Sequence, residues 1–201
     1  MTKRGLLIVV LAAGLACALA LPAAAAPPHQ QEYEQRDPMA GRIGFGFHFG
    51  GVSSNAGTGF EGGLDFTYYV NSYFSTTLGA GYGFYPVDYT GPNDETKTTQ
   101  INYIPVTLAL TVYPLPRSRI SPYFGPGVGM TYSWWKQALS DGGDKKYDQT
   151  LWSVFAEGGL IIALGHGFTA NVGLRYTLPD VSHIDFKDGY LTYSGGGGVT
   201  F

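Results

Sequence analysis

The sequence predicts an all-β fold, an eight-stranded antiparallel transmembrane β-barrel preceded by a cleaved signal peptide. Three observations lead to this fold class. The chain begins with an export signal. The rest of it alternates between apolar and polar residues with a period of two, between breaks rich in turn-forming residues. Its last predicted strand ends on an aromatic residue, Phe201.

The first 26 residues have the three parts of a secretory signal peptide. Lys3 and Arg4 form a basic start, Leu6–Leu21 is almost unbroken apolar sequence, and Ala24–Ala26 supplies small residues for cleavage. A transmembrane anchor is the alternative, but an alanine-rich tract that ends in small residues and prolines favours cleavage. We expect the cut after residue 26, a flexible periplasmic N-terminal tail over 27–40, and the barrel over 41–201.

Cys17 is the only cysteine, and it lies inside the signal segment. A lipoprotein signal would have Leu where Gly14 stands, so lipidation is the weaker interpretation. The mature chain is therefore expected to lack disulfides and cysteine-ligated metal. Removal of Lys3 and Arg4 reduces the 12 basic residues to 10, against 15 acidic ones, and this balance argues against a nucleic-acid partner.

The composition suits strands that face lipid on one side. The chain has 30 Gly, 15 Tyr and 12 Phe, and only 13% of its residues are charged. Eight segments alternate as strands do, most of them slightly longer than the roughly 9–11 residues that cross a bilayer. They are Gly41–Val52, Gly59–Val70, Tyr73–Pro86, Gln100–Tyr113, Pro122–Trp135, Leu151–Leu164, Phe168–Leu178 and Tyr190–Phe201.

The connections are predicted to alternate in length. Asn71-Ser72 and Gly165–Gly167 are tight, and Pro114–Ser121 is intermediate. The longer ones are Ser53–Thr58, Val87–Thr99, Lys136–Thr150 and Pro179–Gly189. Short periplasmic turns and longer extracellular loops are the pattern of membrane barrels, and eight strands place both termini on the periplasmic side.

Alternation also assigns the two faces of each strand. In the fourth segment, aliphatic side chains share one face and small or hydroxyl side chains share the other. The aliphatic face consists of Ile104, Val106, Leu108, Leu110 and Val112. A soluble sandwich or lipocalin-like barrel would turn such a face inward, but the opposite face is too small and polar to complete a core. Aromatic residues near strand ends are expected to form girdles at the membrane boundary. These are Phe74, Tyr113, Phe124, Tyr132, Trp134, Trp152 and Phe168, with Phe201 at the carboxyl end.

Prolines fit this reading less well, because a closed barrel has no edge strand to receive them. We expect Pro122 to begin its strand. Pro105 and Pro126 lie inside their segments, and we expect each to mark a β-bulge.

The chain resembles the small bacterial outer-membrane β-barrel family, the single-domain OmpA/OmpX/OmpW-like proteins. The segments that carry the resemblance are Leu78–Phe84, Ile104–Leu110, Ser121–Met130 and Gly197–Phe201. The resemblance implies the bacterial cell outer membrane as location. It also implies contacts with outer-membrane lipid and lipopolysaccharide, assembly by the barrel-assembly machinery through the C-terminal strand, and a monomer. The family contains structural anchors, adhesins, narrow channels and a few lipid-modifying enzymes, so fold alone does not give function.

Charged residues on the inward face are the candidate site. They are Arg42, His48, Glu61, Asp65, Glu157 and Arg175. Because unpaired charge in a narrow interior is costly, we expect Glu157 to pair with Arg175, and Arg42 to meet Glu61 or Asp65. Such a cluster either plugs the lumen or lines a narrow conduction path. Inward glycines leave room for neighbouring large side chains, leave room for water, or simply permit strand curvature. They are Gly44, Gly46, Gly79, Gly81, Gly83, Gly127, Gly129, Gly196 and Gly198.

No catalytic, cofactor or metal site is predicted. Ser182, His183 and Asp185 lie near one another in sequence, but a catalytic triad is assembled in space. Asp141, Asp144 and Asp148 are interpreted as solvated loop residues, with a divalent cation as the alternative. The leading hypothesis is a structural barrel that displays extracellular loops for envelope integrity and surface interaction. The alternatives are a narrow porin-like channel and, less favoured, a lipid-A-modifying enzyme.

Overall fold

A computed structural model describes residues 39–55, 57–90, 96–116, 118–138, 144–179 and 189–201. The predicted signal peptide, most of the predicted tail and the Ser182–His183–Asp185 set lie outside these residues. Among the described residues, no helix combines the length and the apolar character needed to cross a membrane.

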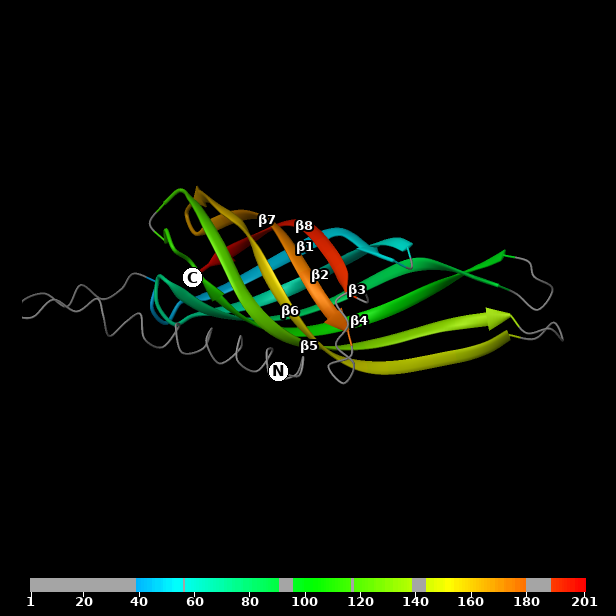
Figure 1. The fold of residues 1–201 in the computed structure, drawn as a ribbon. Coiled ribbons are helices and arrows are strands. Elements are labelled where there is room, and N and C mark those ends of the chain that lie inside the picture. Colours follow the sequence, from blue (N-terminus) through cyan, green and yellow to red (C-terminus); the bar gives the residue numbers. More distant parts are fainter. Residues whose placement is uncertain (1–38, 56, 91–95, 117, 139–143, 180–188) are drawn as a thin grey trace, which may run out of the picture.

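Eight antiparallel strands form a closed barrel in which each strand pairs with the next and β8 pairs with β1 (Figure 1). The strands are β1 (Ile43–Ser54), β2 (Gly57–Tyr69), β3 (Phe74–Thr90), β4 (Thr96–Val112), β5 (Ile120–Ala138), β6 (Asp144–Gly165), β7 (Phe168–Pro179) and β8 (Tyr190–Thr200). The predicted fold class is confirmed, with each predicted segment corresponding to one strand. Closure is the physical solution for a membrane sheet, because it leaves no unpaired edge in hydrocarbon.

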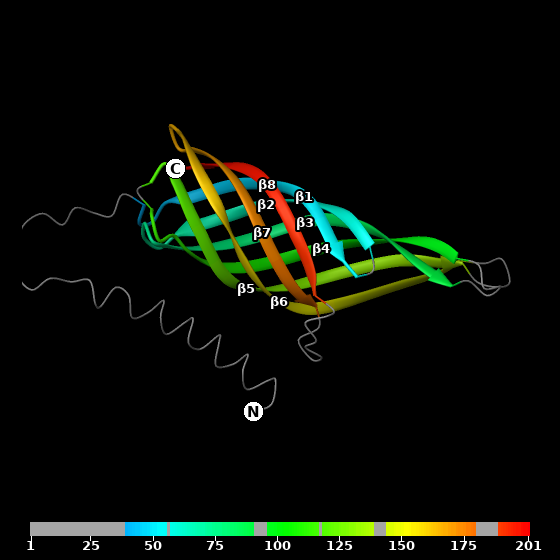
Figure 2. The same cartoon turned by 45° about the horizontal axis from the view of Figure 1, so that its top comes forward.

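The two ends of the barrel differ (Figures 1 and 2). At one end, here called the turn end, short connections join β2 to β3 and β6 to β7, and the chain finishes at Phe201. At the other, here called the hairpin end, β3 to β6 project beyond the remaining strands as two long hairpins, β3–β4 and β5–β6. This extension arises because β5 and β6 have 19 and 22 residues, whereas β1 and β8 have 12 and 11.

Three of the predicted longer loops were wrong. Most of 87–99 and 136–150 continues the hairpins, with Val87 opposite Thr99 and Trp135 opposite Tyr147. Threonines and aromatic residues favour strands even when the segment is polar overall, so polarity alone misplaced these ends. Segment 53–58 is also not a long loop, because Ser54 already pairs with Gly57.

The predicted bulges at two prolines were also wrong. The β4–β5 register runs without a shift past Pro105, and the β5–β6 register runs without a shift past Pro126. The pairing on the opposite edge of each strand is interrupted. The β3–β4 pairing has a gap at Pro105 and the β4–β5 pairing has a gap at Pro126, and both resume in the same register. A missing N–H thus interrupts a ladder without adding a residue. Pro122 does not begin its strand either, since β5 starts at Ile120.

Side-chain exposure follows the predicted alternation. Leu108, Leu160 and Leu174 point outward and are exposed on the apolar wall. Two of the inward glycines lie directly against large aromatic rings. A Cβ added at Gly127 would stand 2.0 Å from the Phe155 ring, and one at Gly83 would stand 2.2 Å from the Tyr103 ring. These two glycines therefore accommodate aromatic side chains that fill the middle of the lumen.

Candidate functional site in the lumen

The predicted pair of Glu157 and Arg175 is present in the structure. The two residues stand directly opposite each other on β6 and β7. Arg175 donates from Nη2 and Nε to the same Glu157 oxygen, at 2.9 and 3.1 Å. The guanidinium carbon also lies 4.6 Å from the centroid of the Phe155 ring. One cation is thus held by a carboxylate and an aromatic face, in a geometry that favours a desolvated guanidinium.

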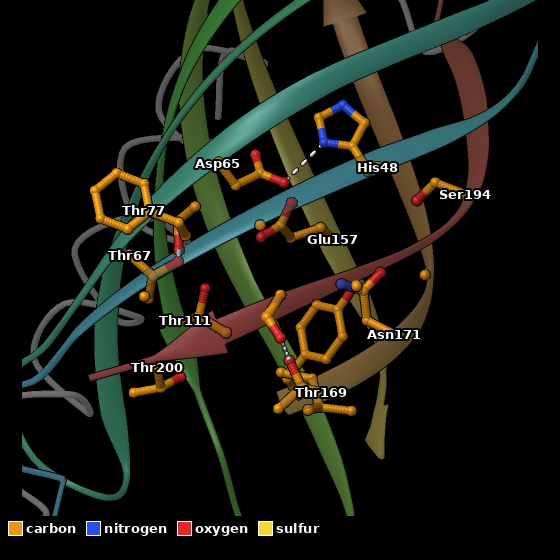
Figure 3. A pocket seen from close by; sticks show the side chains of 18 of the residues that line it. His48, Asp65, Thr67, Thr77, Thr111, Glu157, Thr169, Asn171, Ser194 and Thr200 are labelled. Carbon is orange, nitrogen blue, oxygen red and sulfur yellow. Dashed lines mark hydrogen bonds and ion pairs between the residues drawn. The ribbon is translucent and has the colours of Figure 1, made fainter. Parts of the chain in front are cut away.

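A second acid–base group lies on β1 and β2. Glu61 and Asp65 are opposite Gly50 and Gly46, so His48, opposite Gly63, falls between the two carboxylates. The His48 Nδ1 and Asp65 Oδ2 atoms are 2.7 Å apart, and a dashed line marks this contact in Figure 3. His48 Nε2 is 3.8 Å from Glu61 Oε1. Only the first of these distances is that of a hydrogen bond.

Glu61 instead receives its hydrogen bond from a tyrosine. The Tyr103 hydroxyl donates to Glu61 Oε2 at 2.9 Å, and the two residues are only 3% and 2% exposed. Our sequence reasoning missed Tyr103. Tyr103 lies four residues before Thr107 on β4. Because side chains alternate along a strand with a period of two, both belong to the inward face, and this signal could have identified Tyr103.

Arg42 does not belong to the luminal cluster, and its predicted pairing with Glu61 or Asp65 was wrong. It precedes β1 and is exposed. The physical reason is register: the two carboxylates stand opposite residues 50 and 46, too far along the barrel wall for Arg42 to reach. Its carbonyl oxygen accepts a hydrogen bond from the Tyr69 N–H at the turn end.

Tyr113 is likewise not a girdle residue. It is buried at 7% exposure, and its hydroxyl is 2.9 Å from Ser75 Oγ inside the barrel. Its ring lies near those of Tyr69 and Tyr123. The alternation that turns Val112 outward necessarily turns Tyr113 inward.

The other predicted girdle residues lie on the outward face of their strands. Four of them are exposed, namely Phe124, Tyr132, Trp152 and Phe168. Trp134 stacks on Tyr132 with ring centroids 5.6 Å apart, and Phe74 is the first residue of β3.

The two acid–base groups divide the lumen. A cavity of about 130 Å³ lies on the turn side, lined by His48, Asp65 and Glu157 (Figure 3). A cavity of about 330 Å³ lies on the hairpin side, lined by Tyr85, Tyr103 and other residues. A much smaller cavity of about 10 Å³ shares lining residues with both of them.

Glu61, Phe155 and Arg175 line this smallest cavity. We call the side chains of Glu61, Tyr103, Phe155, Glu157 and Arg175, together with His48 and Asp65, the sealing layer. Within the described part of the chain, no group of three or more His, Cys, Asp or Glu residues is placed to hold a metal ion.

The closed barrel, its apolar outer wall and its charged interior define a bacterial outer-membrane barrel protein. The chain belongs to the family described as the outer membrane protein beta-barrel domain, whose model matches residues 13–199. This places it in the bacterial outer membrane. The comparison with curated protein sequences gives no match.

Solved structures show the same fold. The outer membrane protein OprG from Pseudomonas aeruginosa is 20% identical with a TM-score of 0.61, covering 81% of this chain and 97% of its own. Neisserial surface protein A is 17% identical with a TM-score of 0.56, covering 80% and 96%. A major outer membrane protein from Thermus thermophilus is 10% identical with a TM-score of 0.57, covering 79% and 99%. At these identities the likeness concerns the fold alone.

Proposed function

We propose that this chain is a structural outer-membrane protein that keeps its lumen closed and displays the β3–β4 and β5–β6 hairpins at the cell surface. The observation that carries the proposal is the sealing layer, in which paired charges and an aromatic ring border a cavity of only about 10 Å³ between the two larger luminal cavities. A barrel of eight strands has an interior that side chains can fill. Its contribution is then mechanical and adhesive: envelope integrity and surface interaction.

The proposal includes an orientation. The turn end, with both termini of the barrel, faces the periplasm, and the hairpin end faces outward, as short turns and long hairpins indicate for barrels of this kind. The signal peptide over residues 1–26 is removed on export. Outer-membrane lipid and lipopolysaccharide surround a monomer, and the assembly machinery reads the C-terminal strand that ends at Phe201. No nucleic acid, cofactor or catalytic step is part of the proposal.

Energetics support a lumen that stays closed. To open it, Arg175 would leave both Glu157 and the Phe155 ring, and Tyr103 would leave Glu61. Each departure leaves a charge without its partner in a poorly hydrated interior, which is the costly outcome for buried ion pairs.

A narrow channel is the second candidate, and one observation favours it. Cavities lie on both sides of the sealing layer, and only side chains separate them. A rearrangement of side chains in the sealing layer, including Arg175, Phe155 and Tyr103, could connect the two cavities without any change in the backbone. The channel is therefore the alternative that the main experiment has to exclude.

The experiment is to refold the mature chain, insert it into planar lipid bilayers and record single-channel current. We expect a silent barrel. Glu157→Gln removes the counter-charge of Arg175, and we expect it either to produce measurable current or to lower the free energy of unfolding. Arg42→Gln is the matched control, because it removes an exposed charge outside the layer, and it should change neither. Discrete, reproducible current steps from the unmodified chain would instead establish the channel.

A further inference from the structure

The cavity on the hairpin side has the dimensions of a small-molecule site. Its volume of about 330 Å³ lies at the lower end of the range of about 300–1,000 Å³ for such sites. Tyr103, which lines this cavity, belongs to the sealing layer, so the cavity ends where that layer begins. It is therefore a cup rather than a passage.

The described part of its lining is uncharged. None of the described residues that line it is Asp, Glu, Lys, Arg or His. Glu61, the acid that contacts the lining residue Tyr103, already accepts the hydrogen bond of that tyrosine. An ion or a charged molecule would enter without a counter-charge, and burial of an unpaired charge is strongly unfavourable. The cavity therefore suits a neutral ligand.

The wall formed by β5 and β6 carries hydrogen-bonding side chains. Ser133 stands directly opposite Gln149, and Thr131 and Ser153 follow within the same two strands. None of these four side chains has a hydrogen-bond partner among the described residues. Hydroxyl and amide groups both donate and accept, so this wall can match a ligand that carries several hydroxyls.

Aromatic rings supply the complementary surface. Tyr85, Tyr103 and Tyr190 line the same cavity, and the first two rings have centroids 5.8 Å apart at an angle of 57°. A tyrosine ring presents an apolar face with a polar hydroxyl at its edge. The C–H faces of a sugar ring pack on such surfaces, while its hydroxyls reach outward to polar groups.

We propose that this cavity binds a neutral, polyhydroxylated ring of monosaccharide size. An uncharged lining, four polar side chains without protein partners and three tyrosine rings in one cup favour this chemistry over an ion or a purely apolar molecule. The inference goes beyond the structural role proposed above. It also holds for either orientation in the membrane, because binding is measured on the barrel itself.

The test is titration calorimetry on the refolded mature chain in detergent micelles, with three probes of similar ring size. We expect saturable binding of methyl α-D-glucopyranoside. D-glucuronate, which adds a charge, and cyclohexanol, which keeps only one hydroxyl, should each bind at least fivefold more weakly. Absence of saturable binding for the glucoside overturns the proposal, and so does equal binding of cyclohexanol, which would make the cup an apolar site.

Two isosteric variants locate the binding. Thr131→Val removes one hydroxyl from the cup, and we expect it to weaken glucoside binding at least fivefold. Thr111→Val removes a hydroxyl from the cavity on the turn side and should leave binding within twofold of the unmodified chain. Heat-modifiable migration on gels verifies that each variant is folded. Binding that is insensitive to Thr131→Val, or more sensitive to Thr111→Val, would place the glucoside elsewhere and overturn the assignment.

Discussion

The two acid–base groups of the sealing layer lie in the same lumen but are balanced differently. On β6 and β7, one carboxylate meets one guanidinium through two hydrogen bonds. On β1 and β2, two carboxylates share one histidine, and only Asp65 is within hydrogen-bond distance of it. Glu61 relies on the hydroxyl of Tyr103. The first group is a permanent ion pair. In the second group, the two carboxylates are stabilised by different side chains, Asp65 by a histidine and Glu61 by a tyrosine.

This difference follows from the chemistry of the cations. Arginine is always protonated and offers several donors in a fixed plane, so one residue can satisfy a carboxylate and stack on a ring. Histidine offers two nitrogens, and its charge depends on its surroundings. We therefore expect the barrel to depend more on Arg175 than on any single member of the other group.

The largest effect is expected from Arg175→Met, which keeps a long apolar side chain but leaves Glu157 without a cation. Breaking a buried ion pair costs about 3–5 kcal/mol. We expect the free energy of unfolding to fall by about 3 kcal/mol, the lower end of this range. The Arg175 side chain is 21% exposed, so water can partly solvate the carboxylate that it leaves behind. The measurement is urea unfolding of the barrel in lipid vesicles, followed by tryptophan fluorescence.

Arg42→Met is the matched control for this variant, since it removes the same group from an exposed position before β1. We expect its free energy of unfolding to stay within about 0.5 kcal/mol of that of the unmodified chain. If both variants had the same small effect, the permanent ion pair would contribute little, and the contrast between the two groups would be lost.

An intermediate effect is expected from Tyr103→Phe, which deletes only the hydroxyl that donates to Glu61. Hydrogen bonds to charged groups contribute about 1.5–3 kcal/mol, so we expect a loss of about 2 kcal/mol in the same unfolding measurement. Tyr85→Phe is the control, because that hydroxyl has no hydrogen bond within the described residues. Equal effects of the two variants would mean that Glu61 does not depend on Tyr103.

The sequence was sufficient for the fold and for part of the site. A period of two is a local signal, and it places Glu157 and Arg175 on the inward face whatever the rest of the barrel does. Glu157 and Arg175 each lie nine residues from His166, so counting from the tight turn brings them close to opposition, and a register shift between Ala163 and Gly165 completes the pairing. A short connection between two strands limits how they can pair, so contacts close to such a turn can be predicted from the sequence.

The remaining features depend on geometry that counting does not provide. The pairing of His48 with Asp65 requires the β1–β2 register, and the prediction of a loop over 53–58, where the chain forms a tight hairpin, obscured that register. The bond from Tyr103 to Glu61 joins strands that are not neighbours, so it depends on barrel closure and on the space left by Gly83. Cross-lumen contacts of this kind are tertiary, and no local period reports them.

The smallest effect is expected from His48→Gln, and it tests the comparison most directly. The glutamine amide can still donate a hydrogen bond, and Asp65 borders the turn-side cavity, where water can replace a lost bond. We expect a loss of about 1 kcal/mol in vesicle unfolding, typical of one hydrogen bond, and no current in planar bilayers. His166→Asn, in the turn between β6 and β7, is the control and should be neutral, because asparagine also tolerates the positive φ of 54° at this position. A loss as large as that of Arg175→Met would show that His48 acts as a full counter-ion for both carboxylates, and the two groups would then be equivalent rather than different.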